Sequence, residues 1–167
     1  MTSLISLLVF CQVLGAFSGA FSAVWGEIAY VRAMRDGKVD AAERAHLDII
    51  ARALRFGMSL VLLSSLGLVI AAYAAQTAEQ PAFSPSYWAL VALALIVIGV
   101  SHALSRKTVS FALGSAVVFT AWWFLAYLTL GWLPLRSFGS AVAFFVVATA
   151  IFYGVLQYMR MLAQHQN

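Results

Sequence analysis

The chain has 167 residues, of which 63% are hydrophobic and 10% are charged, and its formal net charge at pH 7 is +4. A composition this apolar cannot cover a soluble globule with polar surface, so it excludes a water-soluble domain and indicates that lipid is the solvent of the folded chain. The single cysteine, Cys11, excludes an internal disulfide and a metal site with four cysteine ligands. The excess of basic residues predicts no nucleic-acid partner, because these residues lie at the ends of apolar runs.

Five apolar runs follow one another along the chain. Each is close to the roughly 20 residues that a helix needs to cross a hydrocarbon core of about 30 Å. The runs predict an all-α fold, a polytopic transmembrane helix bundle of five spans that forms one domain over the whole chain. The predicted spans are residues 4–31, 47–75, 87–105, 108–133 and 137–159.

The first span carries small residues along one helical face. Gly15, Gly19, Ser22 and Gly26 recur at steps of three and four residues. Membrane helices associate by close contact over such residues, so we expect this stripe to pack against a neighbouring helix of the same chain. A seam between copies in a homo-oligomer is the alternative. Gln12, on the same side of the span, is expected to form a hydrogen bond with a neighbouring helix.

A basic stretch, residues 32–38, follows the first span, and Gly37 is expected to make the turn within it. Asp40 followed three residues later by Glu43 has the pattern of a capping box, so the second helix is expected to begin there. Its first turns are polar, and it becomes wholly apolar from Phe56. We therefore expect this helix to extend beyond the membrane face before it enters the lipid.

The basic residues predict the orientation. Nine of the ten lie just beyond alternate ends of the apolar runs: Arg32, Arg35, Lys38, Arg44, Arg52, Arg55, Arg106, Lys107 and Arg160. The exception is Arg136. Cytoplasmic loops of membrane proteins are enriched in Lys and Arg, so the N-terminus is expected outside and the C-terminus in the cytoplasm, in a bacterial inner (plasma) membrane.

Spans three and four are separated by little more than Arg106 and Lys107, so they are expected to form a tight antiparallel pair. Tyr87 and Trp88 are expected to anchor the third span at the outer interface. The fifth span carries a second face of small residues, available for a close crossing: Gly139, Ala143, Ala150 and Gly154.

Glu27 is the most informative polar residue, because it lies roughly 7 Å inside the apolar zone at 1.5 Å per residue. An ionisable group at that depth is costly and usually has a partner. His102 and Gln157 lie at a similar depth, and Arg55 and His46 lie near the cytoplasmic edge. We predict that these five residues form a polar cluster at the cytoplasmic side, which binds a cation, relays protons or holds an anionic head group.

A purely structural interpretation of the same residues stays open. Glu27 would neutralise Arg55 or Arg32, and His102 would cap a helix end at the interface, where polar side chains reach water. In either case Glu27 is expected to face the bundle interior, with Arg55 or His102 as its first candidate partners. Whether a metal binds is left open: His46, His102, Glu27 and Glu43 could supply ligands, but the sequence contains no HxxxH or HxxE spacing.

Three aromatic residues lie in the outer half of the fourth span: Trp122, Trp123 and Tyr127. Their rings could stack on a lipid, a quinone or a porphyrin, and the alternative is that they pack in the core or face lipid. Haem ligation between helices needs a histidine or methionine at matching depth on two spans. His102 lies near the inner edge, so a bis-histidine haem inside one protomer is not expected.

Part of the chain resembles a known class of membrane proteins. The likeness covers about the first 75 residues: Gln12-Val13-Leu14-Gly15, the small residues up to Gly26 and Glu27, the turn from Arg32 to Glu43, and Arg55-Phe56-Gly57. These segments resemble small integral membrane proteins of the copper-resistance CopD-like type, and also short uncharacterised membrane proteins with a basic Asp-Gly-Lys turn after the first span. In such proteins a histidine early in the first span is suspected of binding haem or copper. This chain has Gln12 there, so no site is transferred.

Taken together, these patterns predict a non-enzymatic membrane protein, which acts as a subunit, a scaffold or a small permeation module. The alternative is a redox protein that binds haem b or a quinone. The expected partners are the lipid bilayer and either further copies of the chain or a larger membrane complex.

Overall fold

The computed structural model describes residues 2–33, 40–76, 80–133 and 138–165. Along the chain they form α1 (Thr2–Ala33), α2 (Ala41–Ala74), η1 (Pro81–Phe83), α3 (Pro85–Ser105), α4 (Phe111–Thr129) and α5 (Phe138–His165). These residues contain no β-strand. All five α-helices are long and apolar enough to cross a membrane, which suggests a multi-pass helical membrane protein. The prediction of an all-helical chain with five apolar helices is confirmed.

The helix ends differ from the predicted spans in instructive ways. With 32 and 34 residues, α1 and α2 are about 50 Å long, so they exceed a hydrocarbon core of about 30 Å. α4 is shorter than the predicted span of residues 108–133, because the chain turns at Gly131, whose φ is +70°. α5 continues beyond residue 159, since nothing in its sequence stops the helix at Arg160.

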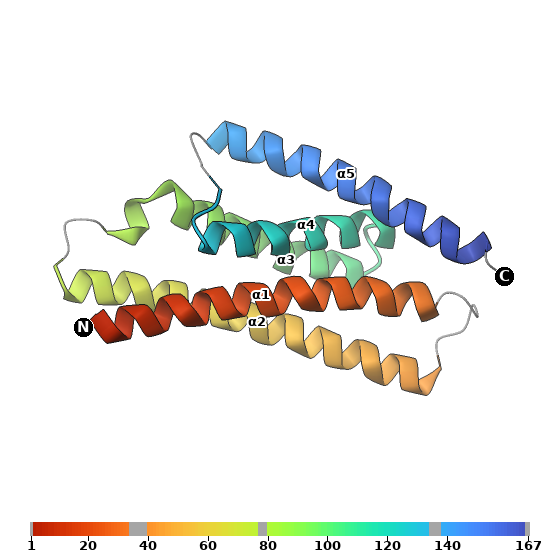
Figure 1. Ribbon diagram of the computed structural model, residues 1–167, viewed down its shortest axis with the longest axis horizontal. Helices are drawn as coiled ribbons and strands as arrows, with labels where there is room; N and C mark the ends of the chain where they lie inside the picture. Colours follow the sequence, from red (N-terminus) through yellow and green to blue (C-terminus); the bar gives the residue numbers. More distant parts are fainter. Residues whose placement is uncertain (1, 34–39, 77–79, 134–137, 166–167) are drawn as a thin grey trace.

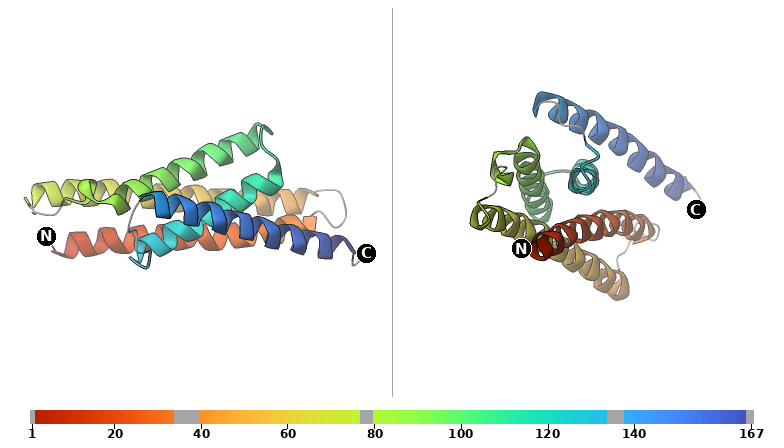
Figure 2. Two further views of the ribbon diagram at one scale, coloured as in Figure 1. Left: turned by 90° about the horizontal axis from the view of Figure 1, so that it is seen from above. Right: turned by 60° about the vertical axis from the view of Figure 1, so that its left-hand side comes forward.

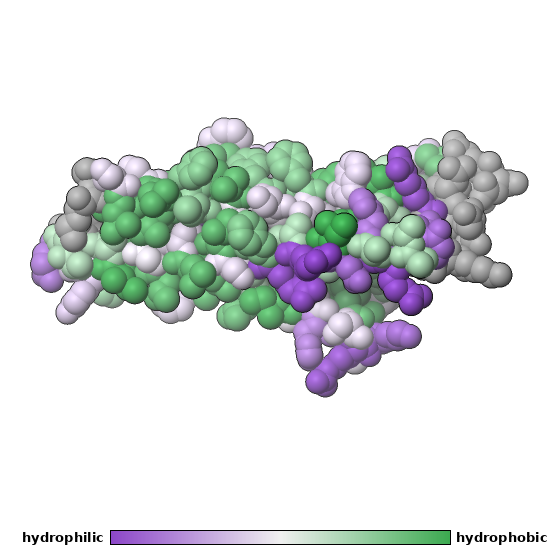
Figure 3. Space-filling model, turned by 90° about the horizontal axis from the view of Figure 1, so that it is seen from below, coloured by the Kyte–Doolittle hydropathy of each residue, from purple (hydrophilic) through white to green (hydrophobic). Residues whose placement is uncertain are grey.

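The capping box predicted at the start of α2 is confirmed. The backbone N–H of Glu43 donates to Asp40 Oδ1 at 2.7 Å, and the backbone N–H of Asp40 donates to Glu43 Oε2 at 3.1 Å. α2 therefore starts before its apolar part, and its first turns carry the polar side chains that gather towards one end of the molecule in Figure 3. The turn predicted at Gly37 lies outside the described residues.

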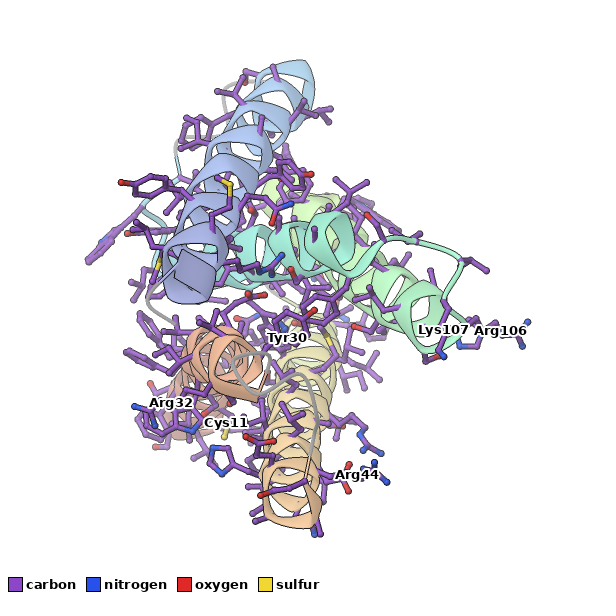
Figure 4. The ribbon with its side chains drawn as sticks, turned by 90° about the vertical axis from the view of Figure 1, so that its right-hand side faces the viewer. Cys11, Tyr30, Arg32, Arg44, Arg106 and Lys107 are labelled. Carbon is purple, nitrogen blue, oxygen red and sulfur yellow. The ribbon has the colours of Figure 1, made fainter. Side chains whose placement is uncertain are left out.

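The chain runs back and forth between two ends of the molecule, so that the N- and C-termini lie at opposite ends (Figure 1). Four of the described basic residues project from the end at which α1 and α3 finish: Arg32, Arg44, Arg106 and Lys107 (Figure 4). We call this the basic end. Spans three and four form the expected antiparallel pair, joined by a short turn in which Lys107 adopts a φ of +56°.

Helices α1 to α4 form the core, and α5 lies obliquely along the outside of α4 (Figures 1 and 2). The largest fully buried side chains belong to α2 and α4: Val61, Thr120, Trp122 and Leu125. On α5, in contrast, Leu156 is the one buried side chain among those described. The fifth helix is therefore attached to the bundle along a narrow strip.

The glycine stripe of α1 makes the close contacts that its spacing predicts. A Cβ atom placed on Gly15 would lie 2.8 Å from the carbonyl oxygen of Gly57 on α2, and one placed on Gly19 would overlap the ring of Trp122 on α4. At Gly26 the neighbour is Ile50 Cγ2 at an ordinary 3.5 Å. The stripe thus lets α1 approach α2 and α4 at two of its three glycines.

Gln12 reinforces the contact between α1 and α2. Its side-chain N–H donates to Ser65 Oγ at 2.8 Å, which is the predicted hydrogen bond between helices. Ser65 Oγ is also 2.6 Å from the carbonyl oxygen of Val61, one turn earlier on its own helix. A half-buried amide on α1 is therefore hydrogen-bonded to a buried hydroxyl on α2.

The small face of α5 makes no comparable contact with the described helices. Cβ atoms placed on Gly139 and Gly154 would meet no atom within 4 Å, and Ala143 and Ala150 are exposed. The close crossing expected on this face is therefore wrong for the contacts within one chain. α5 instead turns larger side chains, such as Phe145 and Leu156, towards the bundle.

Candidate functional site

An ion pair joins α1 to α5 near the basic end. Arg160 Nη2 lies 2.6 Å from Glu27 Oε2 and also donates to Ser115 Oγ of α4 at 2.7 Å. Both charged side chains are 11% exposed. A single guanidinium group therefore connects three helices that are distant in the sequence.

Two aromatic rings cover the guanidinium. Tyr30 and Phe111 are stacked with their centroids 3.9 Å apart, and Arg160 Cζ lies 5.4 Å and 5.3 Å from these centroids. Tyr30 lies between α1 and α4 in Figure 4. A cation over aromatic rings gains electrostatic energy when it is desolvated, which offsets part of the cost of burying the charges. Arg160 Nε is buried without a hydrogen-bond partner among the described residues.

The partner of Glu27 differs from both predicted candidates. Arg55 is exposed, and its Nε donates to the carbonyl oxygen of Ala51 at 3.2 Å. His102 is also exposed. The depth of a residue along a helix follows from counting residues, whereas the direction in which its side chain points depends on how the helix is rotated. From the sequence, Arg160 is only one of the basic residues that predict the orientation, although it lies near the same membrane edge as Glu27.

The other members of the predicted polar cluster lie apart from Glu27. His46 Nε2 accepts a hydrogen bond from Trp25 Nε1 at 2.7 Å, in a contact between α1 and α2. Gln157 makes a long hydrogen bond, 3.5 Å, with the hydroxyl of Tyr153 on its own helix. Within the described residues, the five predicted members share no hydrogen bond or ion pair with one another, so Glu27 takes part in a different cluster.

Two open cavities border α5 on the side of this ion pair. The first, of about 380 Å³, lies between α1 and α5, and its lining runs from Phe119 and Phe152 to Glu27 and Arg32. The second, of about 700 Å³, lies between α4 and α5 and is almost wholly apolar. Its aromatic lining consists of Phe119, Trp123, Phe124, Tyr127, Trp132, Phe144 and Phe152. Because both cavities share Phe119 and Phe152, they adjoin along α5, and we call them together the lateral groove.

The predicted ring-stacking residues have different environments. Trp122 is fully buried and packs against Gly19, so its ring is not available to a ligand. Trp123 and Tyr127 do line the lateral groove, with their ring centroids 6.3 Å apart. Of the two interpretations left open by the sequence, packing in the core applies to Trp122, because α4 turns this residue inward.

A third cavity adjoins the groove near the basic end. It has a volume of about 330 Å³, lies between α1 and α2, and is lined by Trp25, Ile28, Arg32, Glu43 and His46 together with two alanines. Ile28 and Arg32 also line the lateral groove. This hollow, which we call the polar hollow because Arg32, Glu43 and His46 line part of it, thus meets the apolar groove over one turn of α1.

Metal and haem ligation find little support in this geometry. The part of the chain that the structure describes holds no group of three or more His, Cys, Asp or Glu side chains that could bind a metal ion. The aromatic part of the groove is lined by no histidine, cysteine or methionine, so its residues do not fit a haem. What the groove can accommodate is an elongated apolar molecule with a polar end.

Comparison with known proteins suggests no function for this chain, so a function can be inferred only from the geometry of the site. The resemblance to CopD-like proteins stays a prediction. No protein-family model, curated protein or solved structure matches this chain.

Proposed function

We propose that this protein is a non-enzymatic, lipid-binding subunit or scaffold of a membrane, which holds a long apolar chain in the lateral groove beside α5. The observation that carries this proposal is the groove itself. Its two cavities, of about 380 Å³ and 700 Å³, have the size of ordinary small-molecule sites, and they open to the side of the bundle. An opening in that direction admits molecules that are dissolved in the membrane.

Permeation, which the sequence left open, has less support. A path for ions or polar solutes needs polar groups along the bundle interior. The buried polar side chains among the described residues are Ser64, Ser65, Ser115 and Thr120, and each hydroxyl donates to a backbone carbonyl of its own helix. The other buried side chains among the described residues are apolar, apart from the indole N–H of Trp122. An apolar groove on the outside and a closed core inside favour binding over transport.

A quinone is a second candidate for the occupant, because Trp123 and Tyr127 present aromatic rings to the groove. A quinone combines a flat ring, which stacks on aromatic side chains, with a long apolar tail. A stoichiometric quinone in the purified protein would favour this redox interpretation over simple lipid binding.

The groove proposal can be tested by filling the groove from α5. Ala148 lines its aromatic part, whereas Ala150 is exposed on the same helix. In Ala148→Phe the new ring occupies space that the lipid chain would fill, and overpacking of this kind costs about 1 to 3 kcal/mol, so lipid retained through detergent purification should fall roughly tenfold or more. Native mass spectrometry counts this lipid. The matched variant Ala150→Phe should retain as much lipid as the wild type.

Equal retention in the two variants would refute the proposal, provided that both elute as monodisperse protein with unchanged helicity. A loss of lipid in both would show that bulk on α5, and not occupation of the groove, controls retention. That result would also count against the groove.

We further propose that the basic end faces the cytoplasm of a bacterial cell. This proposal rests on the location of the described basic residues at one end of the bundle, where the cytoplasmic side of membrane proteins is enriched in Lys and Arg. In a Cys11→Ser background, Ser3→Cys should react with a membrane-impermeant maleimide added to intact cells, and Gln166→Cys should react only after solubilisation. Labelling of Gln166→Cys in intact cells would reverse the orientation.

A further inference from the structure

We infer that the lipid in the lateral groove is anionic, with its phosphate at Arg32 and its head group in the polar hollow between α1 and α2. This inference rests on the proposed function and specifies the ligand. It starts from the junction at Ile28 and Arg32, which line both the hollow and the groove. A site that changes from polar to apolar over one helical turn matches a molecule whose head and chain are joined in the same way.

The charged residues at this junction favour a head group with a negative charge. Glu27 lines the groove, but its carboxylate is paired with Arg160 at 2.6 Å. Arg32 is exposed and has no ion-pair partner among the described residues. A guanidinium presents a planar fork of donors that fits the oxygens of a phosphate. Among the described residues that line the groove, Arg32 therefore supplies the charge that has no ion-pair partner.

The side chains on the α2 side of the hollow are also compatible with an anionic head group. Glu43 is the acidic residue there, and its carboxylate accepts the backbone N–H of Asp40 in the capping box at the positive end of the α2 dipole. His46 accepts the indole N–H of Trp25 at 2.7 Å through its Nε2. Both acceptors thus already have donors, and Arg32 is left as the charged donor of the hollow.

The chain of the lipid would follow α5 from this junction. Val24, Val155 and Met159 line the groove beyond Ile28, and Phe119 and Phe152 continue the lining into the aromatic cavity. Lipid chains lie along the same direction as membrane helices, so a chain can enter the groove without bending. The head at one end and the aromatic cavity at the other fix the direction in which the lipid binds.

The experiment offers the protein two lipids that have the same acyl chains and differ in the head group, which is anionic in one and zwitterionic in the other. The protein is reconstituted with equal amounts of phosphatidylglycerol and phosphatidylcholine with the same acyl chains, extracted gently and analysed by native mass spectrometry. The wild type should retain phosphatidylglycerol in preference by about fivefold, the factor expected for one basic residue at a membrane surface. Glycerol phosphate at millimolar concentration should not displace it, because this anion has no chain for the groove.

Variants of Arg32 test whether this side chain causes the preference for phosphatidylglycerol. Arg32→Gln should abolish the preference and keep a chain in the groove, whereas Arg32→Lys should keep most of the preference because it keeps the charge. Arg44→Gln is the matched control, because Arg44 is an exposed arginine of the same end that lines neither cavity. This control should select phosphatidylglycerol as the wild type does.

The outcomes separate this inference from the proposed function. Equal retention of the two lipids by the wild type, together with loss of both in Ala148→Phe, would overturn the inference and leave lipid binding in place. Equal effects of Arg32→Gln and Arg44→Gln would assign the preference to general surface charge and overturn it too. If Ala148→Phe retains lipid as Ala150→Phe does, the groove is not the site and both proposals fail.

Discussion

Arg160→Met is expected to lower the free energy of unfolding by about 3 kcal/mol, the cost of removing one partner of a buried ion pair. The variant leaves the Glu27 carboxylate without a cation in a site that is only 11% exposed. It also removes the hydrogen bond to Ser115 and the cation that lies over Tyr30 and Phe111. Reversible unfolding of the protein in mixed micelles measures the difference.

Arg106→Met is the control for this prediction. Arg106 is an exposed arginine of the basic end, and substitution of an exposed side chain usually changes stability by less than about 0.5 kcal/mol. The double variant Glu27→Leu/Arg160→Met should regain part of the stability lost in either single variant, because it leaves no unpaired charge. If Arg160→Met were as stable as Arg106→Met, the ion pair would not hold α5 to the bundle.

Gly19→Leu is expected to destabilise the protein by about 3 kcal/mol, at the upper end of the usual range for overpacking. Even the first added carbon would overlap the ring of Trp122, which is fully buried and has no open space to move into. The new side chain must therefore force α1 and α4 apart. Thermal unfolding in detergent, followed by circular dichroism, measures the loss.

The matched variant is Gly26→Leu, about two turns further along the same stripe. Its first added carbon meets Ile50 Cγ2 at an ordinary contact distance of 3.5 Å. We expect a cost below about 1 kcal/mol, because leucine also has a better helix propensity than glycine. Equal losses in the two variants would mean that Gly19 is no closer to its neighbour than Gly26 is, contrary to the contact with Trp122.

Local features of the chain could be read from the sequence because they depend on neighbouring residues. The five apolar helices follow from runs of apolar residues that are long enough to cross a membrane. The start of α2 follows from Asp40 and Glu43, whose side chains cap the helix within four residues of sequence. The close approach at Gly15 and Gly19 follows from the spacing of small residues on one face. The first two features hold whatever the other helices do, and the third requires only that some helix packs on the glycine face.

The tertiary structure alone decided which residues meet. The sequence placed Glu27, Arg55, His102 and Arg160 within a few residues of the same membrane edge, but only the rotation and tilt of each helix bring Arg160 to Glu27. The same rotation buries Trp122 and leaves its neighbour Trp123 in the groove. These angles are set by packing between helices that are far apart in the chain, so no local pattern encodes them.

The position of α5 was the least predictable feature. Its small residues favoured a close crossing, yet this face is open, and Phe145 and Leu156 pack towards the bundle instead. In lipid, apolar side chains gain little by leaving an environment as apolar as themselves, so a hydrophobic helix can expose any of its faces. The sequence by itself thus determined the helices and the end at which their charges gather. Only the contacts between helices decided that α5 would border a lateral groove and be joined to α1 by one buried ion pair.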